Sequence, residues 1–247
     1  MVDSLGYRMK FGVIAPSTNT SVQPEFDAMA PPGITNHMSR IHVPDNPIAN
    51  DDDFNKLVEE IAAAQDAAIE RLMTCHPGHI VMGISAETFW DGLEASKKLK
   101  KHIEKISGVG VTMGSESSQA ALKAYGAKKI AVITPYQPVG DKNVKRFFEE
   151  CGFDVVRIKG LKAKSPVLIA HFSEDELRDA VLEVDGDDVD AIIQAGTNLA
   201  FARTAMIAEK WLKKPVIAIN TATYWHALRT NGFDDKVQGF GSLLADH

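Results

Sequence analysis

The chain has 247 residues, 45% of them hydrophobic, which is enough to bury a sizeable core in one or two domains. Its 27 lysines and arginines against 33 aspartates and glutamates give a net charge of −6, which argues against a nucleic-acid partner because such partners need clustered cations. The N-terminus lacks a signal-peptide layout, and no apolar run approaches the roughly 20 residues of a membrane helix, so we expect no membrane partner and a cytoplasmic location.

Six short apolar runs, each ended by proline, glycine or a polar residue, predict buried strands. In chain order they cover residues 10–17, 79–85, 111–115, 129–136, 190–197 and 217–221. Between them, apolar residues at three- and four-residue spacing predict helices. The predicted helices cover 53–73, 143–151, 174–184 and 204–212, and two more follow the strands at 111–115 and 217–221. Gly126, Gly152 and Gly232 stand where a helix end favours a positive φ.

The predicted strands form matched pairs in the same order, which suggests an internal duplication. The pairs are 10–17 with 129–136, 79–85 with 190–197, and 111–115 with 217–221. We therefore predict an α/β protein of two similar halves, each a parallel sheet flanked by helices, related by a pseudo-two-fold axis with the active site in the cleft between them. Residues 1–112 plus 218–247 would form the first half and residues 113–217 the second. Chance similarity among βα units is the alternative.

The ends of the predicted strands are rich in serine, threonine and asparagine and poor in lysine and arginine. Ligands of parallel sheets bind at the carboxyl ends of the strands, where helix N-termini also offer free N–H groups to anions. Hydroxyl groups and helix N-termini together suit a small carboxylate. The alternative is that these residues only cap helices. The segments concerned are 16–20, 84–88, 114–118, 135–139, 196–199 and 220–223.

The chain lacks the common cofactor and metal motifs. No G-x-G-x-x-G follows a predicted strand, no P-loop is present, and the eight histidines and two cysteines show no ligand spacing, so we expect neither cofactor nor metal. Glu116 stands where a nucleophile elbow has serine, so a serine hydrolase that uses Ser115 or Ser117 is a minor alternative. The acidic segment 185–190 lacks a calcium-loop pattern and is predicted to be a solvated turn.

Several short motifs resemble one superfamily of enzymes, in the same order along residues 10–232. Residues 12–20 (Gly-Val-Ile-Ala-Pro-Ser-Thr-Asn-Thr) resemble the opening segment of maleate cis-trans isomerases, and 134–136 and 196–199 resemble later segments of that family. Residues 89–92 and 224–229 resemble stretches of arylmalonate decarboxylases. Both families belong to the aspartate/glutamate racemase superfamily. The resemblance implies two similar α/β halves, a cofactor-independent site in the cleft and small carboxylate substrates.

Both positions of the catalytic cysteines in this superfamily are substituted in the chain. The resemblance assigns Ile84, or Gly83 with a shift of one residue, to the first position and Gly196 to the second. None of these residues can transfer a proton. Cys75 and Cys151 are expected at helix ends, away from the cleft. We therefore do not expect a two-cysteine mechanism.

Glu87 and His226 are the candidates to replace the missing thiols. Glu87 follows a predicted strand beside Phe89 and Trp90, where burial would raise its pKa toward neutrality. Its alternative role is that of a first-turn glutamate that interacts with the helix dipole, and the alternative for His226 is structural. Tyr136 completes the predicted catalytic set. The predicted substrate-binding residues are Ser17, Asn19, Ser85, Thr197, Asn198 and Thr221.

The resemblance assigns Tyr136, Ser17, Asn19 and Asn198 to the binding of carboxylate oxygens and to the stabilisation of an enolate. These observations predict a cofactor-independent lyase or isomerase that acts on a small mono- or dicarboxylate, similar to maleate or malonate, through an enediolate-like intermediate. A non-catalytic carboxylate-binding protein and a hydrolase built on the same cleft are the alternatives. Apart from the substrate, a homo-oligomer would be ordinary for such a chain.

Overall fold

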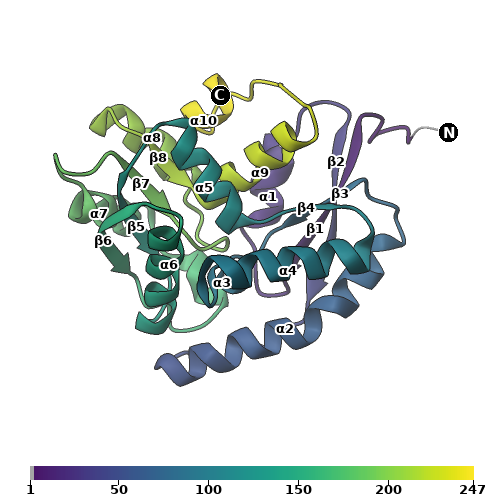
Figure 1. Ribbon diagram of the computed structural model, residues 1–247, viewed down its shortest axis with the longest axis horizontal. Coiled ribbons are helices and arrows are strands. Elements are labelled where there is room, and N and C mark those ends of the chain that lie inside the picture. The colour runs from purple at the N-terminus through teal and green to yellow at the C-terminus, as the bar shows by residue number, and fades with distance from the viewer. Residues whose placement is uncertain (1–2) are drawn as a thin grey trace.

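The computed structural model describes residues 3–247 and shows two α/β halves side by side (Figure 1). Each half is built on a four-stranded parallel sheet, with strand order β2-β1-β3-β4 in the first half and β6-β5-β7-β8 in the second. The identical order confirms the two similar halves expected from the sequence. The strands are β1 (Met9–Pro16), β2 (Ile34–Ile41), β3 (His79–Met82), β4 (Gly110–Thr112), β5 (Lys129–Thr134), β6 (Asp154–Gly160), β7 (Ala191–Gln194) and β8 (Val216–Ala218).

Helices cover the faces of both sheets, and the predicted ones are all present. Gly126, Gly152 and Gly232 have φ values of 67°, 89° and 76°, as expected for residues that end helices. The helices are α1 (Val22–Met29), α2 (Asp51–Met73), α3 (Ala86–Phe89), α4 (Gly92–Ser107), α5 (Gly114–Ala124), α6 (Pro138–Glu150), the 3₁₀ helix η1 (Val167–His171), α7 (Glu174–Val184), α8 (Ala202–Leu212), α9 (Ile219–Thr230) and α10 (Ser242–Asp246). Among residues 3–247, no helix is long and apolar enough to cross a membrane.

Strands β2 and β6, each at one edge of its sheet, were not predicted from the sequence. Both strands are only partly buried, and their sequences (ITNHMSRI and DVVRIKG) show no long apolar run. Because most side chains of β2 and β6 are partly exposed, these strands carry a weaker hydrophobic signal than the central strands β1 and β5.

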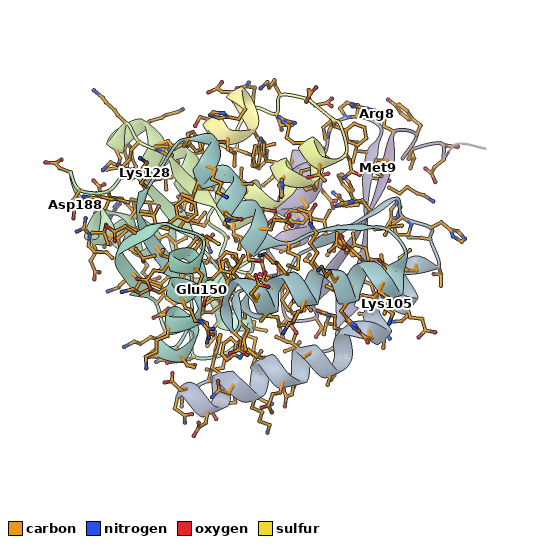
Figure 2. The ribbon with its side chains drawn as sticks, viewed as in Figure 1. Arg8, Met9, Lys105, Lys128, Glu150 and Asp188 are labelled. Carbon is orange, nitrogen blue, oxygen red and sulfur yellow. The ribbon has the colours of Figure 1, made fainter. Side chains whose placement is uncertain are left out.

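One hydrophobic core cluster contains residues of both halves, so the halves pack against each other. Phe89 of α3 contacts Phe147 and Phe148 of α6, with ring centroids 5.1 and 5.6 Å apart. At the end of α6, Glu150 (labelled in Figure 2) accepts a hydrogen bond of 2.7 Å from the backbone N–H of Leu93 in the first half. Helices α5 and α9 pack against each other at the centre, and α9 also contacts α1 and β3. The boundaries at 112 and 218 stay a prediction.

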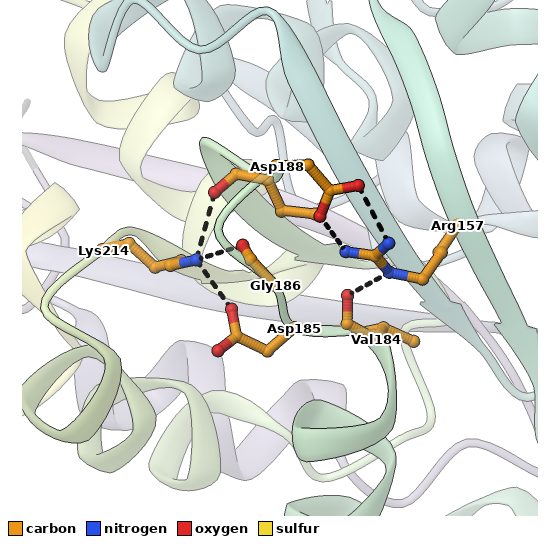
Figure 3. Close-up of polar contacts among 7 residues, drawn as sticks. Arg157, Val184, Asp185, Gly186, Asp188 and Lys214 are labelled. Carbon is orange, nitrogen blue, oxygen red and sulfur yellow. Dashed lines mark hydrogen bonds and ion pairs between the residues drawn. The ribbon is translucent and has the colours of Figure 1, made fainter.

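The acidic segment between α7 and β7 forms a turn in which two carboxylates, those of Asp185 and Asp188, are paired with cations (Figure 3). Arg157 of β6 binds both carboxylate oxygens of Asp188 at 2.5 and 3.0 Å and the carbonyl of Val184 at 2.9 Å. Lys214 lies 2.7 Å from the carboxylate of Asp185 and also donates to the carbonyl of Gly186. These contacts anchor the loop that leads into β7, one of the strands that ends at the candidate site.

We expect Phe148→Ala to lower the free energy of unfolding by about 3–5 kcal/mol, because it removes a fully buried ring from the junction of the halves. Urea denaturation would measure the change. Leu182→Ala, at a position of α7 that is 54% exposed, is the control and should alter stability by less than about 0.5 kcal/mol. Equal losses in the two variants would contradict the prediction.

Candidate active site

A pocket of about 50 Å³ lies between the halves, at the carboxyl ends of β1, β3, β5 and β7. This is the edge at which a parallel sheet binds its ligands. Residues of both halves form its base. The first half contributes Pro16, Thr18, Asn19, Ile84, Ser85 and Ala86, and the second contributes Pro135, Tyr136, Gly196, Thr197 and Asn198.

The loops after β3 and β7 occupy equivalent positions in the two halves. The backbone N–H of Gly83 donates to the carbonyl of Ile14 in β1 at 2.7 Å, and the N–H of Ala195 donates to the carbonyl of Ile133 in β5 at 2.8 Å. The next two positions therefore correspond across the pseudo-two-fold axis. These pairs are Ile84 with Gly196 and Ser85 with Thr197.

The hydroxyl group of Ser85 connects the two halves at the base of the pocket. It forms a hydrogen bond of 2.6 Å with the phenol oxygen of Tyr136 and accepts one of 3.0 Å from the backbone N–H of Thr197. The hydroxyl of Thr197 in turn donates to the carbonyl of Gly83 at 3.1 Å and lies 3.2 Å from the side-chain amide of Asn19. Each half thus places a polar side chain against a loop of the other half.

The pocket is uncharged, and Tyr136 is its strongest side-chain donor. Burial raises the pKa of Tyr136 above its usual value, although the hydrogen bond to Ser85 partly opposes this. The phenol is therefore protonated at neutral pH. Within residues 3–247, no acidic, basic or thiol side chain lines the pocket. A hydrogen bond to an anion is stronger in such apolar surroundings than in water.

Asn19 and Asn198 line the pocket but already have hydrogen-bond partners. The side-chain oxygen of Asn19 accepts from the backbone N–H groups of Ser21 and Val22, at the start of α1. The side-chain oxygen of Asn198 accepts from the N–H of Thr20 at 2.9 Å, across the interface between the halves. Both asparagines hold the loops in place, and Asn19 also satisfies helix N–H groups, the alternative considered from the sequence.

Ser17 and Thr221 are not among the residues that line the pocket. The hydroxyl of Ser17 donates to the carbonyl of Val43 at 3.1 Å and accepts from its N–H at 2.9 Å. Ser17 therefore holds the loop after β2 beside the pocket. Thr221 is buried in the first turn of α9.

Glu87 is buried in α3, immediately after the pocket residue Ala86, but does not itself line the pocket. Burial raises the pKa of Glu87 to about 8. One of its carboxylate oxygens has no hydrogen-bond partner among the described residues. The raised pKa agrees with the environment expected for this residue, whereas a direct contact with the pocket is not present.

His226 also lies outside the pocket lining, where its Nδ1 is 3.1 Å from the hydroxyl of Ser117. Burial lowers the pKa of His226. Ser117 donates its proton to the carbonyl of Met113 at 2.7 Å, and Ser115 shares a hydrogen bond with Ser96. Neither serine is exposed, so this geometry does not present an activated serine nucleophile to a ligand.

The two cysteines lie away from the pocket. Cys75 follows α2, and its thiol donates to the carbonyl of Leu72. Cys151 ends α6, and burial raises the pKa of its thiol to about 11, which disfavours the thiolate.

The roof of the pocket, which was not predicted from the sequence, is formed by α2, by the loops after β2 and β6 and by η1. The two loops are joined by a hydrogen bond of 2.7 Å from the N–H of Ile48 to the carbonyl of Lys164, and Gln137 donates to the carbonyl of Ile48 at 3.2 Å. The prolines in 43–48 and 164–166 could have marked paired loops had β2 and β6 been recognised. The roof residues are Val43, Phe54, Leu57, Ile61, Pro166 and Ile169.

Comparisons with known proteins agree along nearly the whole chain. The family model of arylmalonate decarboxylase matches residues 11–244. A maleate isomerase of Alcaligenes faecalis is 25% identical over 252 residues, and the match covers 96% of each chain. A maleate isomerase of Pseudomonas putida is 24% identical over 250 residues, and the match covers 96% of this chain and 97% of the relative.

Solved structures of these enzymes share the fold. A mutant maleate cis-trans isomerase of Nocardia farcinica with a covalently bound succinylcysteine intermediate has a TM-score of 0.89 and 18% identity, and covers 97% of this chain and 99% of its own. A crystal structure of arylmalonate decarboxylase has a TM-score of 0.77 and 18% identity, with coverage of 95% and 98%. By the match of its sequence to the family model over residues 11–244, the chain belongs to the arylmalonate decarboxylase family.

Proposed function

We propose that the protein is a cofactor-independent lyase or isomerase that acts on a small carboxylate through an enediolate-like intermediate. The observation that carries this proposal is the hydroxyl pair of Tyr136 and Ser85 at the base of an uncharged pocket. The family membership and the relatives named maleate isomerase support an enzyme of this kind.

In the proposed reaction, the substrate carboxylate accepts a hydrogen bond from Tyr136 at the base of the pocket. When a bond at the adjacent carbon breaks, either carbon dioxide leaves or a proton passes to a base, His226 or the ionised form of Glu87. The electron pair of the broken bond moves onto the oxygens of the bound carboxylate. The donors then stabilise a larger negative charge than in the bound substrate, which is the condition for lowering the barrier. A proton is finally added to the same carbon.

The apolar roof supports a substrate whose other end is apolar. Phe54, Leu57 and Ile169 line it, and within residues 3–247 no cationic side chain lines the pocket to face a second, distant carboxylate. Burying such a carboxylate without a partner would cost several kcal/mol. Two carboxylates on one carbon are different, because both lie at the same end of the substrate and neither has to enter the apolar roof. Malonate-like acids with an apolar substituent therefore fit the pocket better than maleate.

The backbone at Gly196 supports a mechanism without two thiols. Its φ is 133°, and a Cβ atom there would lie 2.4 Å from Cδ of Pro135. A cysteine at this position would need the loop to move. At the equivalent position of the first half, Ile84 presents an aliphatic side chain to the pocket.

Glu87 is our proposed proton donor, and His226 is the second candidate. Because burial raises the pKa of Glu87 to about 8, its side chain carries a proton at neutral pH. Its carboxyl lies outside the pocket lining, so proton transfer requires a bridging water or a rotation of its side chain. Catalytic contacts of this kind often form only when substrate is bound.

The uncharged lining also favours one other function, that of a carboxylate-binding protein without turnover. Proton NMR in D₂O with maleate, substituted malonates, aspartate and hydroxy acids separates the two. Loss, isomerisation or deuterium labelling of a component would establish an enzyme and identify the bond that reacts. Thermal stabilisation by one of these acids without chemical change would support the binding protein instead.

We expect Tyr136→Phe to reduce kcat/KM by about 100- to 1,000-fold, because it removes the main donor to the developing negative charge. Steady-state kinetics on the substrate found by NMR would measure the loss. Tyr125→Phe is the matched control, since its phenol bonds to Ser242 and does not line the pocket. Equal activity of the two variants would contradict the role of Tyr136.

We expect Glu87→Gln to abolish turnover while ligand binding, measured by calorimetry, is retained. In the wild-type protein, kcat should decline above about pH 8, because the carboxyl loses the proton that it donates. Glu94→Gln, at an exposed position of α4, is the control and should keep both the rate and the pH profile. Full activity of Glu87→Gln would refute the proposed role and leave His226 as the donor.

A further inference from the structure

Two carboxylates occupy equivalent positions behind the two sides of the pocket. Glu25 is the fourth residue of α1, the helix that follows β1, and Asp141 is the fourth residue of α6, the helix that follows β5. Both are partly buried and neither lines the pocket. An acidic residue in a first helical turn usually faces solvent, so the partial burial of both carboxylates is unusual.

Asp141 is connected to the backbone of Tyr136 by one intervening hydroxyl group. The hydroxyl of Thr134, the last residue of β5, donates to the carboxylate of Asp141. The same hydroxyl oxygen accepts a hydrogen bond of 3.1 Å from the backbone N–H of Tyr136. A charged acceptor therefore orients the threonine hydroxyl so that its lone pair faces the tyrosine N–H.

Glu25 has a similar connection to the loop of Thr197. Its carboxylate accepts a hydrogen bond of 2.6 Å from the side-chain amide of Asn220, and that amide nitrogen also donates to the carbonyl of Thr197 at 2.9 Å. The backbone N–H of Ala202 approaches the other carboxylate oxygen at 3.4 Å. Glu25 thus holds the start of α9 and the loop after β7 together.

Both connections end at Ser85, which bonds to the phenol of Tyr136 and to the backbone N–H of Thr197. We propose that Asp141 and Glu25 are paired positioning residues that, in their ionised forms, fix Tyr136 and Thr197 against the Ser85 hydroxyl from opposite sides. Ionisation matters because a carboxylate is the stronger acceptor for the threonine hydroxyl and the asparagine amide. Only the predicted effect on turnover rests on the proposed function; the positioning does not.

The surroundings make both carboxylates titrate near neutral pH. Burial raises the pKa of Asp141 to about 6; the hydrogen bond from Thr134 and the charge of Lys162 oppose this, and the charge of Asp51 adds to it. Burial raises the pKa of Glu25 to about 7, opposed by its bonds from Asn220 and Ala202, which are both neutral. Helices α3 and α4 also pack on α6, but they contact its C-terminal part and not Asp141. Phe89 of α3 contacts Phe147, and the N–H of Leu93 in α4 donates to Glu150. Acidification should therefore release both connections.

The first test needs no substrate. The chain has four tyrosines, so ¹⁵N-tyrosine labelling gives four backbone signals, and Tyr136→Phe identifies that of Tyr136 by its loss. We expect this signal to shift with a midpoint near pH 6 in the wild-type protein. Asp141→Asn should remove the shift, and so should Thr134→Val, which keeps the carboxyl and removes the intervening hydroxyl.

Glu149→Gln is the matched control, because it neutralises an exposed carboxylate on the same helix, and the shift should persist. The Glu25 side is tested in the same way with ¹⁵N-threonine labelling. The backbone signal of Thr197 should shift with a midpoint near pH 7 in the wild-type protein, and Glu25→Gln should remove this shift. Asp27→Asn, at an exposed position of the same helix, is the control and should keep it. A Tyr136 signal that does not titrate in the wild-type protein would overturn the proposal, and this measurement does not depend on the folding of any variant. A signal that still titrates in Thr134→Val would also overturn it.

With a substrate in hand, kinetics provide the second test. Wild-type kcat should fall on the acid side as Asp141 and Glu25 take up protons. Asp141→Asn should lower kcat at pH 8 by about 10- to 100-fold and remove the part of the acid limb near pH 6, with little change in KM. Equal kcat and an unchanged acid limb would overturn the link to catalysis. A protein without turnover but with the expected Tyr136 titration would contradict the proposed function and leave the positioning intact.

Discussion

The hydrogen bonds of the Ser85 hydroxyl are the interaction on which the architecture of the candidate site depends. This single oxygen contacts the phenol of Tyr136 and the backbone N–H of Thr197, both from the second half of the chain. Because these groups are buried, a small shift of one half against the other would cost each of them its partner without giving it a water molecule in exchange. The need to satisfy these polar groups therefore holds two otherwise similar halves in one relative position.

The strand order explains how such distant residues can meet. In each half the central strand, β1 or β5, lies beside β3 or β7, so the loops that follow these strands share one edge of the sheet. The pseudo-two-fold arrangement then brings the loop of one half against the loop of the other. Asn19 and Thr197, which are separated by 178 residues in the chain, contact each other for this reason. The aromatic cluster of α3 and α6 is a second, apolar contact between the two halves.

The electrostatics of the site follow from this burial. Charged side chains are kept out of the pocket lining in residues 3–247, and the carboxylates of Glu25, Glu87 and Asp141 lie behind it. Burial raises the pKa of all three toward neutral pH, because a charged carboxylate is poorly solvated there. The pocket lining therefore offers neutral hydrogen-bond donors to an anion. The three carboxylates that exchange protons near neutral pH lie outside this lining. This division distinguishes the site from one built on thiols.

The sequence alone predicts the α/β class, the two similar halves, helices α2 and α5 to α9, and the strand-end segments that form the base of the pocket. These properties depend on local signals, namely apolar runs, helical periodicity and glycines at helix ends, which can be read without knowledge of distant contacts. Which polar residues face the pocket depends on tertiary contacts. Tyr136, Ser85 and Thr197 meet at its base. Asn19 and Asn198 also line it, but their side chains hold the surrounding loops. The other predicted residues lie outside the lining, namely Ser17, Glu87, Thr221 and His226. The direction of a side chain in a strand-end loop depends on the hydrogen bonds available from the other half, and the order of residues along the chain does not specify these.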